Sequence, residues 1–289
     1  MSVLLKHATE TYVDWMIAQE RSNQTIRGYK MDLELIRVFL ESRNNGPVYV
    51  DDITTEDIEV YLKMLKDEKG YKASSRNRHL NSLRAFYKYV NKKGISTKNP
   101  TAPIDQVKVQ KQERTYLTEE EINLLVKEIR HPIIKMIVQF LFMSGLRISE
   151  CLSLKLSDVD LEKGVIYVKN GKGKKDRNVP ISTKLNPLLT QYLKKVRPKT
   201  TSDHFFATKK TGKISAAYVN RVLQESVKTL GWNKRVTAHT MRHSFASQLV
   251  VRNVNPVSIQ KLLGHSDLKT TSIYVHANAE LLTEAINAI

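Results

Sequence analysis

The stretch from Pro132 to Glu150, PIIKMIVQFLFMSGLRISE, decides the fold of the second half of this 289-residue chain. Proline is favoured in the first turn of a helix, and an apolar run follows it here. Gly145 is a typical helix stop, because glycine adopts the left-handed backbone conformation at little cost. The pattern therefore predicts an apolar helix that ends at Gly145 and places Arg147 at a junction between helices.

Upstream of this helix the sequence has the features of a domain boundary. Residues 99–114, NPTAPIDQVKVQKQER, contain two prolines, many polar residues and no hydrophobic periodicity, which is typical of a linker. Thr118 and Glu121 then form a capping-box pattern, and Leu117 with Ile122 matches a hydrophobic staple. We expect an N-terminal domain over residues 1–106, a linker over 107–116 and a C-terminal domain over 117–289.

The N-terminal domain carries three helical patterns, with apolar residues at three- and four-residue spacings. Ser22 can cap the first helix, and Asn44-Asn45-Gly46-Pro47 ends it. The second helix follows Thr54, and the third runs from about Ser74 to Asn91. These patterns predict a helical bundle.

The third of these helices lies in a strongly basic part of the chain. From Lys72 to Lys98 there are eight basic residues and no acidic one. A run of charges is more often a solvated helix face than a binding surface, but the lack of acidic side chains favours contact with DNA phosphates. The candidate DNA-binding residues are Arg76, Arg78, Arg84 and Lys88.

Beyond Gly164 the pattern changes from helical spacing to alternation. Val165-Ile166-Tyr167-Val168 and Asn178-Val179-Pro180-Ile181 flank a basic, glycine-containing loop, which predicts a β-hairpin. Helical patterns then resume, and Asn255-Pro256 marks a helix start that Gly264 ends. The predicted fold class is mainly α with a small β-hairpin or sheet (α+β), a helical bundle followed by a mixed α/β domain.

The composition predicts a polyanionic partner. The chain has 47 Lys and Arg against 29 Asp and Glu, a formal net charge of +18, with +5 on residues 1–114 and +13 on residues 115–289. Nucleic acid and acidic membrane surfaces both fit such an excess. No apolar run is long enough to span a membrane and the N-terminus lacks signal-peptide features, so we expect a cytoplasmic protein. The single cysteine, Cys151, can form no internal disulfide and is expected in the core.

Four segments of the C-terminal domain carry side chains suited to a phosphodiester. Each alone has an ordinary interpretation as a surface arginine, a solvated lysine loop or a core tyrosine. Together they supply two guanidinium groups, two imidazoles, an ammonium and a phenol, with no acidic side chain required. The segments are Gly145-Leu146-Arg147, the hairpin loop 169–177, His239-Thr240-Met241-Arg242-His243, and Leu263-Gly264-His265 followed by Tyr274.

In this combination and order the motifs resemble those of the tyrosine recombinase (phage integrase) family, in particular its Xer-like members, which cut and rejoin DNA through a phosphotyrosine. The resemblance spans nearly the whole chain and implies a core-binding domain and a catalytic domain that form a C-shaped DNA clamp. The implied catalytic set is Arg147 in GLRISE, Lys172 in GKGKKDR, His239 and Arg242 in HTMRH, His265 in LLGH and Tyr274 in TSIYVH.

The resemblance implies further residues around this set. Glu150 matches the position of a supporting acidic residue. Lys174 and Lys175 share the hairpin loop with Lys172 and remain alternatives to it, and with Arg177 they are candidates for DNA contact.

The implied roles agree with the chemistry of these side chains. Arg147 and Arg242 can bind the non-bridging phosphate oxygens and stabilise the charge of the transition state. Tyr274, a phenol with an ordinary pKa near 10, needs a proton acceptor, and the resemblance assigns this role to His239. Lys172 can protonate the leaving 5′ oxygen. Because the phosphotyrosine keeps the energy of the broken bond, no metal ion, ATP or other cofactor is expected.

Other functions remain open on the sequence alone. His239 and His243 also have the spacing of metal ligands, but the neighbouring Arg242 would repel a cation, and we interpret His243 as a packed histidine. A type IB topoisomerase-like enzyme uses similar residues without exchanging partners, and a catalytically silent DNA-binding protein could share the fold. A metal-dependent nuclease would need a carboxylate cluster, which the sequence lacks.

The C-terminal residues 279–289 place four apolar side chains on one stripe of a short helix, which is marginal alone and must dock somewhere. Docking on its own domain is one interpretation. The resemblance implies docking on a neighbouring protomer, with a dimer on each short inverted-repeat DNA site and a tetramer in synapsis. Accessory proteins and the biological role, whether resolution, integration and excision, or inversion, are left open.

Overall fold

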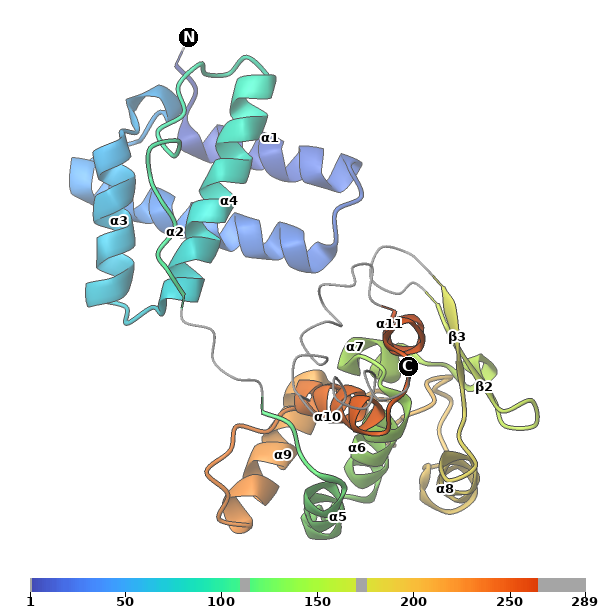
Figure 1. Ribbon diagram of the computed structural model, residues 1–289. Coiled ribbons are helices and arrows are strands. Elements are labelled where there is room, and N and C mark those ends of the chain that lie inside the picture. The colour runs from blue at the N-terminus through green and yellow to red at the C-terminus, as the bar shows by residue number, and fades with distance from the viewer. Residues whose placement is uncertain (1, 110–114, 170–175, 265–289) are drawn as a thin grey trace, which may run out of the picture. The chain divides into compact units, whose positions relative to one another are not determined.

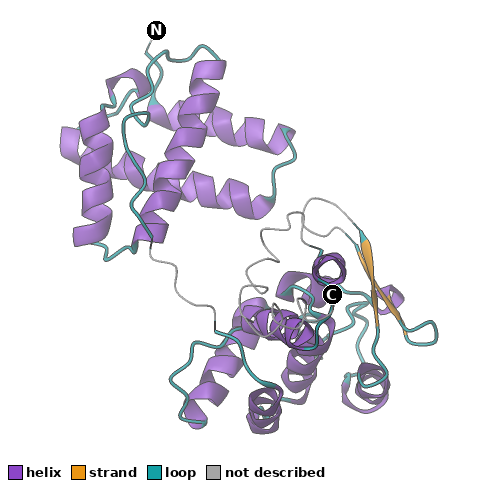
Figure 2. Ribbon diagram, viewed as in Figure 1, coloured by secondary structure: helices purple, strands orange, loops and turns teal. Residues whose placement is uncertain are grey.

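The computed structural model describes residues 2–109, 115–169 and 176–264. The chain divides into two units, Met1–Gln112 and Glu113–Ile289, and the division falls within the stretch expected to be a linker. Each unit has its own hydrophobic core. The described secondary structure is mostly helical with a small sheet in the second unit (Figure 2), so the predicted fold class is confirmed.

The first unit is a helical bundle in which α4 contacts the other three α-helices. The predicted cap at Ser22 is present, since its Oγ accepts the Thr25 N–H at 3.1 Å, and the helix expected after Thr54 begins with a capping box of Thr54 and Asp57. α2 ends where the left-handed Asn45 follows it, at φ 52°. The helices are α1 (Leu5–Ala18), α2 (Asn23–Asn44), α3 (Thr55–Asp67) and α4 (Ala73–Lys92), with a 3-10 turn at Val50–Asp52 (Figure 1).

A buried polar cluster joins α2, α3 and α4. Asp32 of α2 forms an ion pair with Arg78 at 2.5 Å, accepts Ser82 Oγ at 2.7 Å and lies 3.4 Å from His79 Nε2. The other ring nitrogen of His79 lies 2.9 Å from the hydroxyl oxygen of Tyr61 on α3. Burial lowers the pKa of His79, which favours the neutral ring at pH 7. The cluster gives hydrogen-bond partners to the buried side chains of Asp32, His79 and Ser82.

After α4 the chain runs back beside that helix. Asn77 bonds both backbone groups of Val107, its Oδ1 accepting the N–H at 2.9 Å and its Nδ2 donating to the carbonyl at 2.8 Å. About two turns further along the helix, Arg84 donates to the Ile104 carbonyl oxygen. These bonds hold residues 104–107 against α4.

The second unit is built around α6 (Pro132–Ser144), which packs against α5, α7, α8 and α10. Eight of its 13 residues are buried, which explains the apolar run in the sequence. As predicted, Pro132 opens this helix and Gly145, at φ +65°, ends it. The predicted capping box of Thr118 and Glu121 opens α5. The bounds of the neighbouring helices are α5 Glu119–Glu128, α7 Ile148–Ser153, α8 Leu185–Gln191 and α10 Ala238–Val251.

A three-stranded antiparallel sheet has the order β1-β2-β3. β2 (Val165–Val168) and β3 (Arg177–Pro180) form the predicted hairpin, with Val168 opposite Arg177. β1 (Val159–Asp160), which follows a 3-10 turn at Leu156–Asp158, was not predicted, since two residues are too few to produce an alternating pattern.

The remaining helices complete the unit. α8 continues into a π-helical turn at Tyr192–Val196, and α9 (Ala216–Thr229) precedes α10. Asn255 caps α11 (Pro256–Leu263), and Gly264, at φ +64°, ends it as predicted. α10 contacts both α6 and α11, so it connects the two helices that end in left-handed glycines. Among the helices described here, none is long and apolar enough to cross a membrane.

Candidate active site

Arg242 lies in α10 and is almost completely buried, with 2% of its surface exposed. Its Nη1 donates to the Gly145 carbonyl at 2.7 Å, and its Nη2 donates to the Leu263 carbonyl at 2.6 Å. The carbonyls at the C-terminal end of a helix lack intrahelical partners and carry the negative end of the helix dipole. The guanidinium of Arg242 thus joins the ends of α6 and α11.

Arg147 lies two residues beyond the glycine that ends α6, at the junction predicted from the sequence. It is the N-cap residue of α7, and its backbone N–H donates to Glu150 Oε2 at 2.8 Å. Its side chain donates from Nη1 to Glu150 Oε1 at 2.7 Å and from Nη2 to the Gly264 carbonyl at 3.3 Å. The guanidinium is therefore fixed from two sides.

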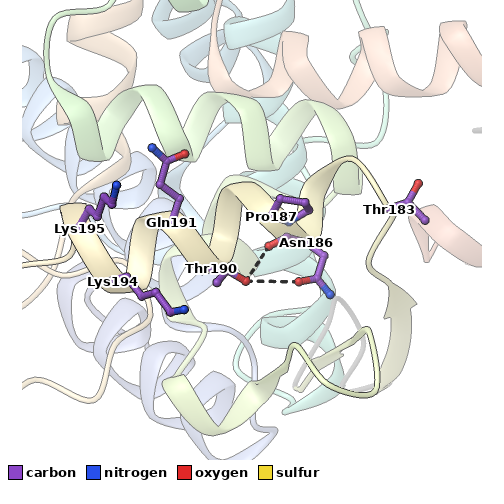
Figure 3. A pocket seen from close by; sticks show the side chains of 7 residues that line it. All are labelled: Thr183, Asn186, Pro187, Thr190, Gln191, Lys194 and Lys195. Carbon is purple, nitrogen blue, oxygen red and sulfur yellow. Dashed lines mark hydrogen bonds between the residues drawn. The ribbon is translucent and has the colours of Figure 1, made fainter.

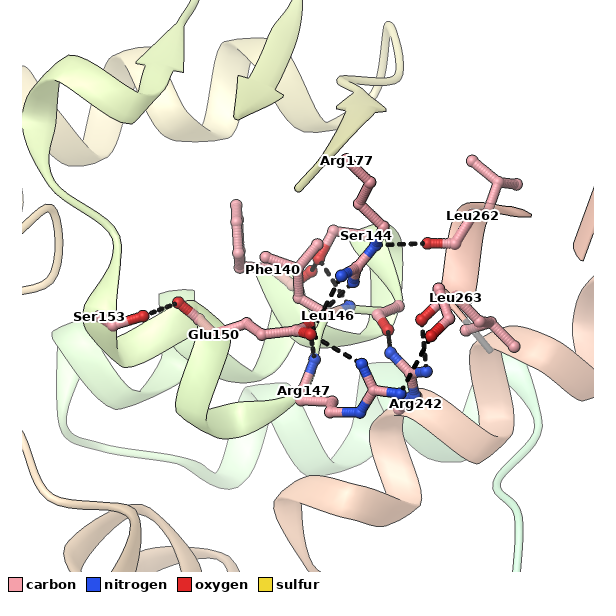
Figure 4. Close-up of polar contacts among 12 residues, drawn as sticks. Phe140, Ser144, Leu146, Arg147, Glu150, Ser153, Arg177, Arg242, Leu262 and Leu263 are labelled. Carbon is pink, nitrogen blue, oxygen red and sulfur yellow. Dashed lines mark hydrogen bonds and ion pairs between the residues drawn. The ribbon is translucent and has the colours of Figure 1, made fainter. Parts of the chain in front are cut away.

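Three arginines from different elements meet at the end of α11 (Figure 4). Arg177 Nε donates to the Leu262 carbonyl at 3.2 Å. Arg242 and Arg147 donate to the carbonyls of the next two residues, Leu263 and Gly264. Three consecutive carbonyls thus accept from β3, α10 and the start of α7. This arrangement gathers three positive charges within one turn of helix.

Glu150 is the buried acidic residue of this cluster, with 7% of its surface exposed. Arg177 binds both of its carboxylate oxygens, with Nη1 3.0 Å from Oε1 and Nη2 2.8 Å from Oε2. Burial raises the pKa of Glu150, but the hydrogen bonds from Arg177 and from the Arg147 backbone, with the charge of Arg177, lower it to about 2. Glu150 is therefore ionised at neutral pH and binds two arginines.

His239 and His243 lie one turn apart on α10. His239 is exposed, whereas His243 is half-buried, and their ring centroids are 4.5 Å apart with the rings nearly perpendicular. Within the described parts of the chain there is no group of three His, Cys, Asp or Glu side chains that could hold a metal ion. The described site therefore offers cationic donors and imidazoles, which suit a phosphate group.

The comparisons with known proteins decide the family. A family model described as phage integrase family matches residues 115–280, and a second, described as phage integrase, N-terminal SAM-like domain, matches residues 10–94. The chain belongs to the phage integrase family. This confirms the resemblance inferred from the motifs.

Members of the family resemble the chain over nearly its full length. Tyrosine recombinase XerC of Oceanobacillus iheyensis is 30% identical, with 96% of this chain and 93% of the relative covered. Tyrosine recombinase XerA of Pyrococcus furiosus is 34% identical, with 98% and 94% covered. A solved structure of a lambda integrase dimer bound to a core site covers 95% of both chains at 20% identity, with a TM-score of 0.78, and so shares the fold. The predicted function is confirmed at this level: the chain is a site-specific tyrosine recombinase, a DNA strand transferase.

Several predicted residues of this phage integrase family member lie outside the described residues. They are Lys172, Lys174, Lys175, His265, Tyr274 and the terminal helix over 279–289. Their roles stay predictions. The described residues bring Arg147, Arg242 and Glu150 together, with His239 on the same helix as Arg242. Gly264, which accepts from Arg147, directly precedes His265 in the chain.

The candidate DNA-binding residues of α4 have different surroundings. Arg78 is half-exposed although it pairs with Asp32, with 52% of its side chain accessible. Lys88 is exposed and Arg76 is half-buried. Arg84 is half-buried and bonds a backbone carbonyl of its own unit. Arg78 and Lys88 are therefore the better placed of the four to reach a partner.

The position of Arg177 differs from what the sequence suggests. It was predicted as a DNA contact of the hairpin loop, yet its guanidinium bonds Glu150 and Leu262 within the protein, and 13% of the side chain is exposed. Sequence reasoning missed these bonds because the residues lie 27 and 85 positions apart. One signal in the sequence was available. Glu150 directly precedes Cys151, which was expected in the core, and a buried carboxylate needs cationic partners.

A pocket elsewhere in the second unit carries none of the predicted catalytic residues. Its volume is about 630 Å³, and it lies along α8 and the π-helical turn that follows (Figure 3). Thr190 Oγ1 donates to the Asn186 carbonyl at 3.1 Å within its wall. The lining residues are Thr183, Asn186, Pro187, Thr190, Gln191, Lys194 and Lys195.

Proposed function

We propose that this protein cleaves and rejoins DNA at a short site through a covalent bond between Tyr274 and a 3′ phosphate. The observation that carries the proposal is the convergence of Arg147 and Arg242 on neighbouring carbonyls at the end of α11. A phosphate at this place would meet two guanidinium groups held in fixed orientations, and preorganised cations stabilise the negative charge of a phosphorane. The chain continues from there through His265 to Tyr274.

In the proposed reaction, the Tyr274 oxygen attacks the phosphorus and the bond from phosphorus to the 5′ oxygen breaks. His239 accepts the phenol proton, and Lys172 gives a proton to the departing 5′ oxygen. Arg147 and Arg242 bind the two non-bridging oxygens throughout. Attack by a 5′ hydroxyl of another strand reverses these steps and restores the phosphodiester, so that no external energy source is consumed.

We propose double-stranded DNA with a short inverted repeat as the partner, bound by a dimer at each site and a tetramer in synapsis. The net charge of +18 supports a polyanionic partner that the protein would meet at the nucleoid. The lambda integrase that shares the fold was solved as a dimer on a core site, which supports assembly on DNA. Arg78 and Lys88 of the first unit are proposed to contact the phosphate backbone.

A nicked suicide substrate, which loses a short fragment on cleavage and so traps the covalent complex, tests the chemistry. Wild-type protein should form an adduct, and Tyr274→Phe should form none while binding the same DNA. Arg147→Ala and Arg242→Ala should each slow formation of the adduct by about 100-fold or more, which is the loss in rate seen when one oxyanion donor is removed. Arg130→Ala, which removes an exposed arginine of the same unit, is the matched control and should react at the wild-type rate.

A modified substrate shows which lysine of the hairpin loop acts as the general acid. Replacing the leaving 5′ oxygen with sulfur removes the need for a general acid, because a thiolate leaves without protonation. Lys172→Ala should cleave the sulfur substrate at close to the wild-type rate and the ordinary substrate slowly. If Lys174→Ala or Lys175→Ala shows this pattern instead, the assignment moves to that residue.

A further inference from the structure

The carboxylate of Glu150 is shared by two arginines that lie on separate elements. Its oxygens accept four N–H groups, two from Arg147 and two from Arg177. A carboxylate offers about four lone-pair positions, so these bonds saturate it. Oε1 is common to both guanidinium groups, at 2.7 Å from Arg147 and 3.0 Å from Arg177. The orientation of Arg147 therefore depends on a carboxylate that Arg177 holds in place.

Arg177 is also fixed at the end of α11. Beyond its bond to the Leu262 carbonyl, its side chain occupies the space beside Gly264, where an added Cβ would lie 3.0 Å from Arg177 Cδ and 3.1 Å from Cζ. The same glycine supplies the carbonyl that Arg147 binds. Arg177 thus supports both groups that orient Arg147, namely Glu150 and the α11 end.

The charges of the cluster give Arg177 a second effect. Arg147, Arg242 and Arg177 carry three positive charges against the single negative charge of Glu150. Without Arg177, the buried Glu150 would be balanced by Arg147 alone, so less of the positive charge of Arg147 would remain to stabilise the negative charge that develops in the transition state. A buried carboxylate also needs its hydrogen-bond donors, because leaving it short of them is costly.

We propose that Arg177 is a positioning residue of the recombinase: through Glu150 and the end of α11 it holds Arg147 in the orientation that binds the scissile phosphate, and it does not itself bind DNA. Arg177 is the first residue of β3, directly after the hairpin loop that carries Lys172. Arg177 therefore connects β3, the strand that follows this loop, to Arg147 through the carboxylate of Glu150. The inference rests on the proposed role of Arg147.

Single-turnover cleavage of the suicide substrate, measured alongside DNA affinity, tests this role. Arg177→Met keeps the length of the side chain and removes its donors. The cleavage rate at saturating protein should fall on the order of 100-fold, the scale expected for a misplaced catalytic group. The Kd for a single site and its salt dependence should stay at the wild-type values. A phosphate contact would instead lower the slope of log affinity against log salt by about 0.9.

A double-mutant cycle shows whether Arg177 acts through Glu150. Glu150→Gln and Arg177→Met should each slow cleavage. The double variant should lose much less activity than the two single losses multiplied together, because both substitutions remove the same interaction. Arg130→Ala in the Glu150→Gln background is the control and should add nothing. Additive losses would overturn the proposal.

The remaining outcomes separate this inference from the proposed function. Normal cleavage by Arg147→Ala would reject the role of Arg147 itself. Slow cleavage by Arg147→Ala with normal cleavage by Arg177→Met, or a lower salt slope in Arg177→Met, would reject the positioning role alone. If Arg177→Met does not fold at the assay temperature, Arg177→Lys replaces it, since lysine keeps the charge but cannot bind both carboxylate oxygens in a plane. Arg177→Lys should also cleave slowly at unchanged affinity, and a normal rate would contradict the proposal.

Discussion

At the scale of single residues, the site is organised by backbone carbonyls and one carboxylate. Arg147 and Arg242 could be predicted from residue type, spacing and family resemblance, and so could the glycine that ends α6. The acceptors that orient the arginines could not be predicted, because main-chain carbonyls carry no sequence signal. The pairing of Arg177 with Glu150 was also hidden, since it depends on how β3 packs near α7.

At position 145 both the backbone conformation and the packing favour glycine. Its φ is +65°, and an added Cβ would lie 2.4 Å from the ring of Phe245. Gly145→Ala should lower the free energy of unfolding of the second unit by about 1–2 kcal/mol for the left-handed backbone and a further ~1–3 kcal/mol for the clash. Gly231→Ala is the matched control, because Gly231 has φ +69° with nothing within 4 Å and should cost only the backbone part.

Tryptophan fluorescence can follow the unfolding of the second unit separately from that of the first. The chain has two tryptophans, Trp15 in the first unit and Trp232 in the second. In a Trp15→Phe background, denaturant unfolding therefore reports on the second unit. Equal losses in Gly145→Ala and Gly231→Ala would contradict the account of Gly145.

The pKa of Glu150 predicts a pH dependence of stability. Its folded-state pKa of about 2 lies below the ordinary value of 4.5, so its contribution is complete above about pH 5 and is lost as pH falls toward 2. The difference in free energy of unfolding between wild type and Glu150→Gln should shrink by about 2 kcal/mol from pH 6 to pH 3. A difference that stays constant over this range would show that Glu150 is not stabilised as an anion.

At the scale of elements, several helix boundaries could be predicted from the sequence, whereas α1 (Leu5–Ala18) and some junctions were not predicted. The caps predicted at Ser22 and Thr118 open helices, because a cap depends on residues only three positions apart. The helix expected after Thr54 also begins there, with a capping box that was not predicted. The two-residue β1 and the π-helical turn after α8 escaped prediction, since neither has a period of its own. Long-range pairs such as Asp32 with Arg78 likewise leave no local pattern.

The buried cluster around Asp32 should stabilise the first unit. Asp32→Ala removes the partner of Arg78, His79 and Ser82, and we expect a loss of about 3 kcal/mol, as when one member of a buried pair is deleted. Asp14→Ala, an exposed aspartate of α1, should change stability by less than about 0.5 kcal/mol. Unfolding followed by Trp15 in a Trp232→Phe background reports on this unit. Equal effects of the two substitutions would refute the role of the cluster.

At the scale of the whole molecule, the charge excess gains a more specific meaning. A net charge of +18 alone is compatible with any polyanion. The structure gathers Arg147, Arg177 and Arg242 at the end of one helix. We propose that Arg147 and Arg242 bind a single phosphate and that Arg177 supports Arg147. We propose that other cationic side chains of the chain follow the DNA backbone.

The apolar C-terminal stripe predicts how copies of the chain cooperate. Deleting residues 279–289 should leave binding to a single inverted-repeat half-site unchanged and weaken assembly of the synaptic complex, because the stripe is proposed to dock on a neighbouring protomer. Gel-shift titration and recombination between two labelled sites measure the two effects separately. Unchanged recombination by the truncated protein would contradict the docking role.

The position of the DNA in the trapped covalent complex shows whether Tyr274 is the nucleophile. Trypsin cleavage after Lys269 yields residues 270–289, which contain Tyr274 and no other of the 12 tyrosines. After nuclease trimming, mass spectrometry should find the nucleotide mass on this peptide, and the Tyr274→Phe protein should give no modified peptide. A nucleotide on any other tyrosine, or an adduct that persists in Tyr274→Phe, would contradict the account.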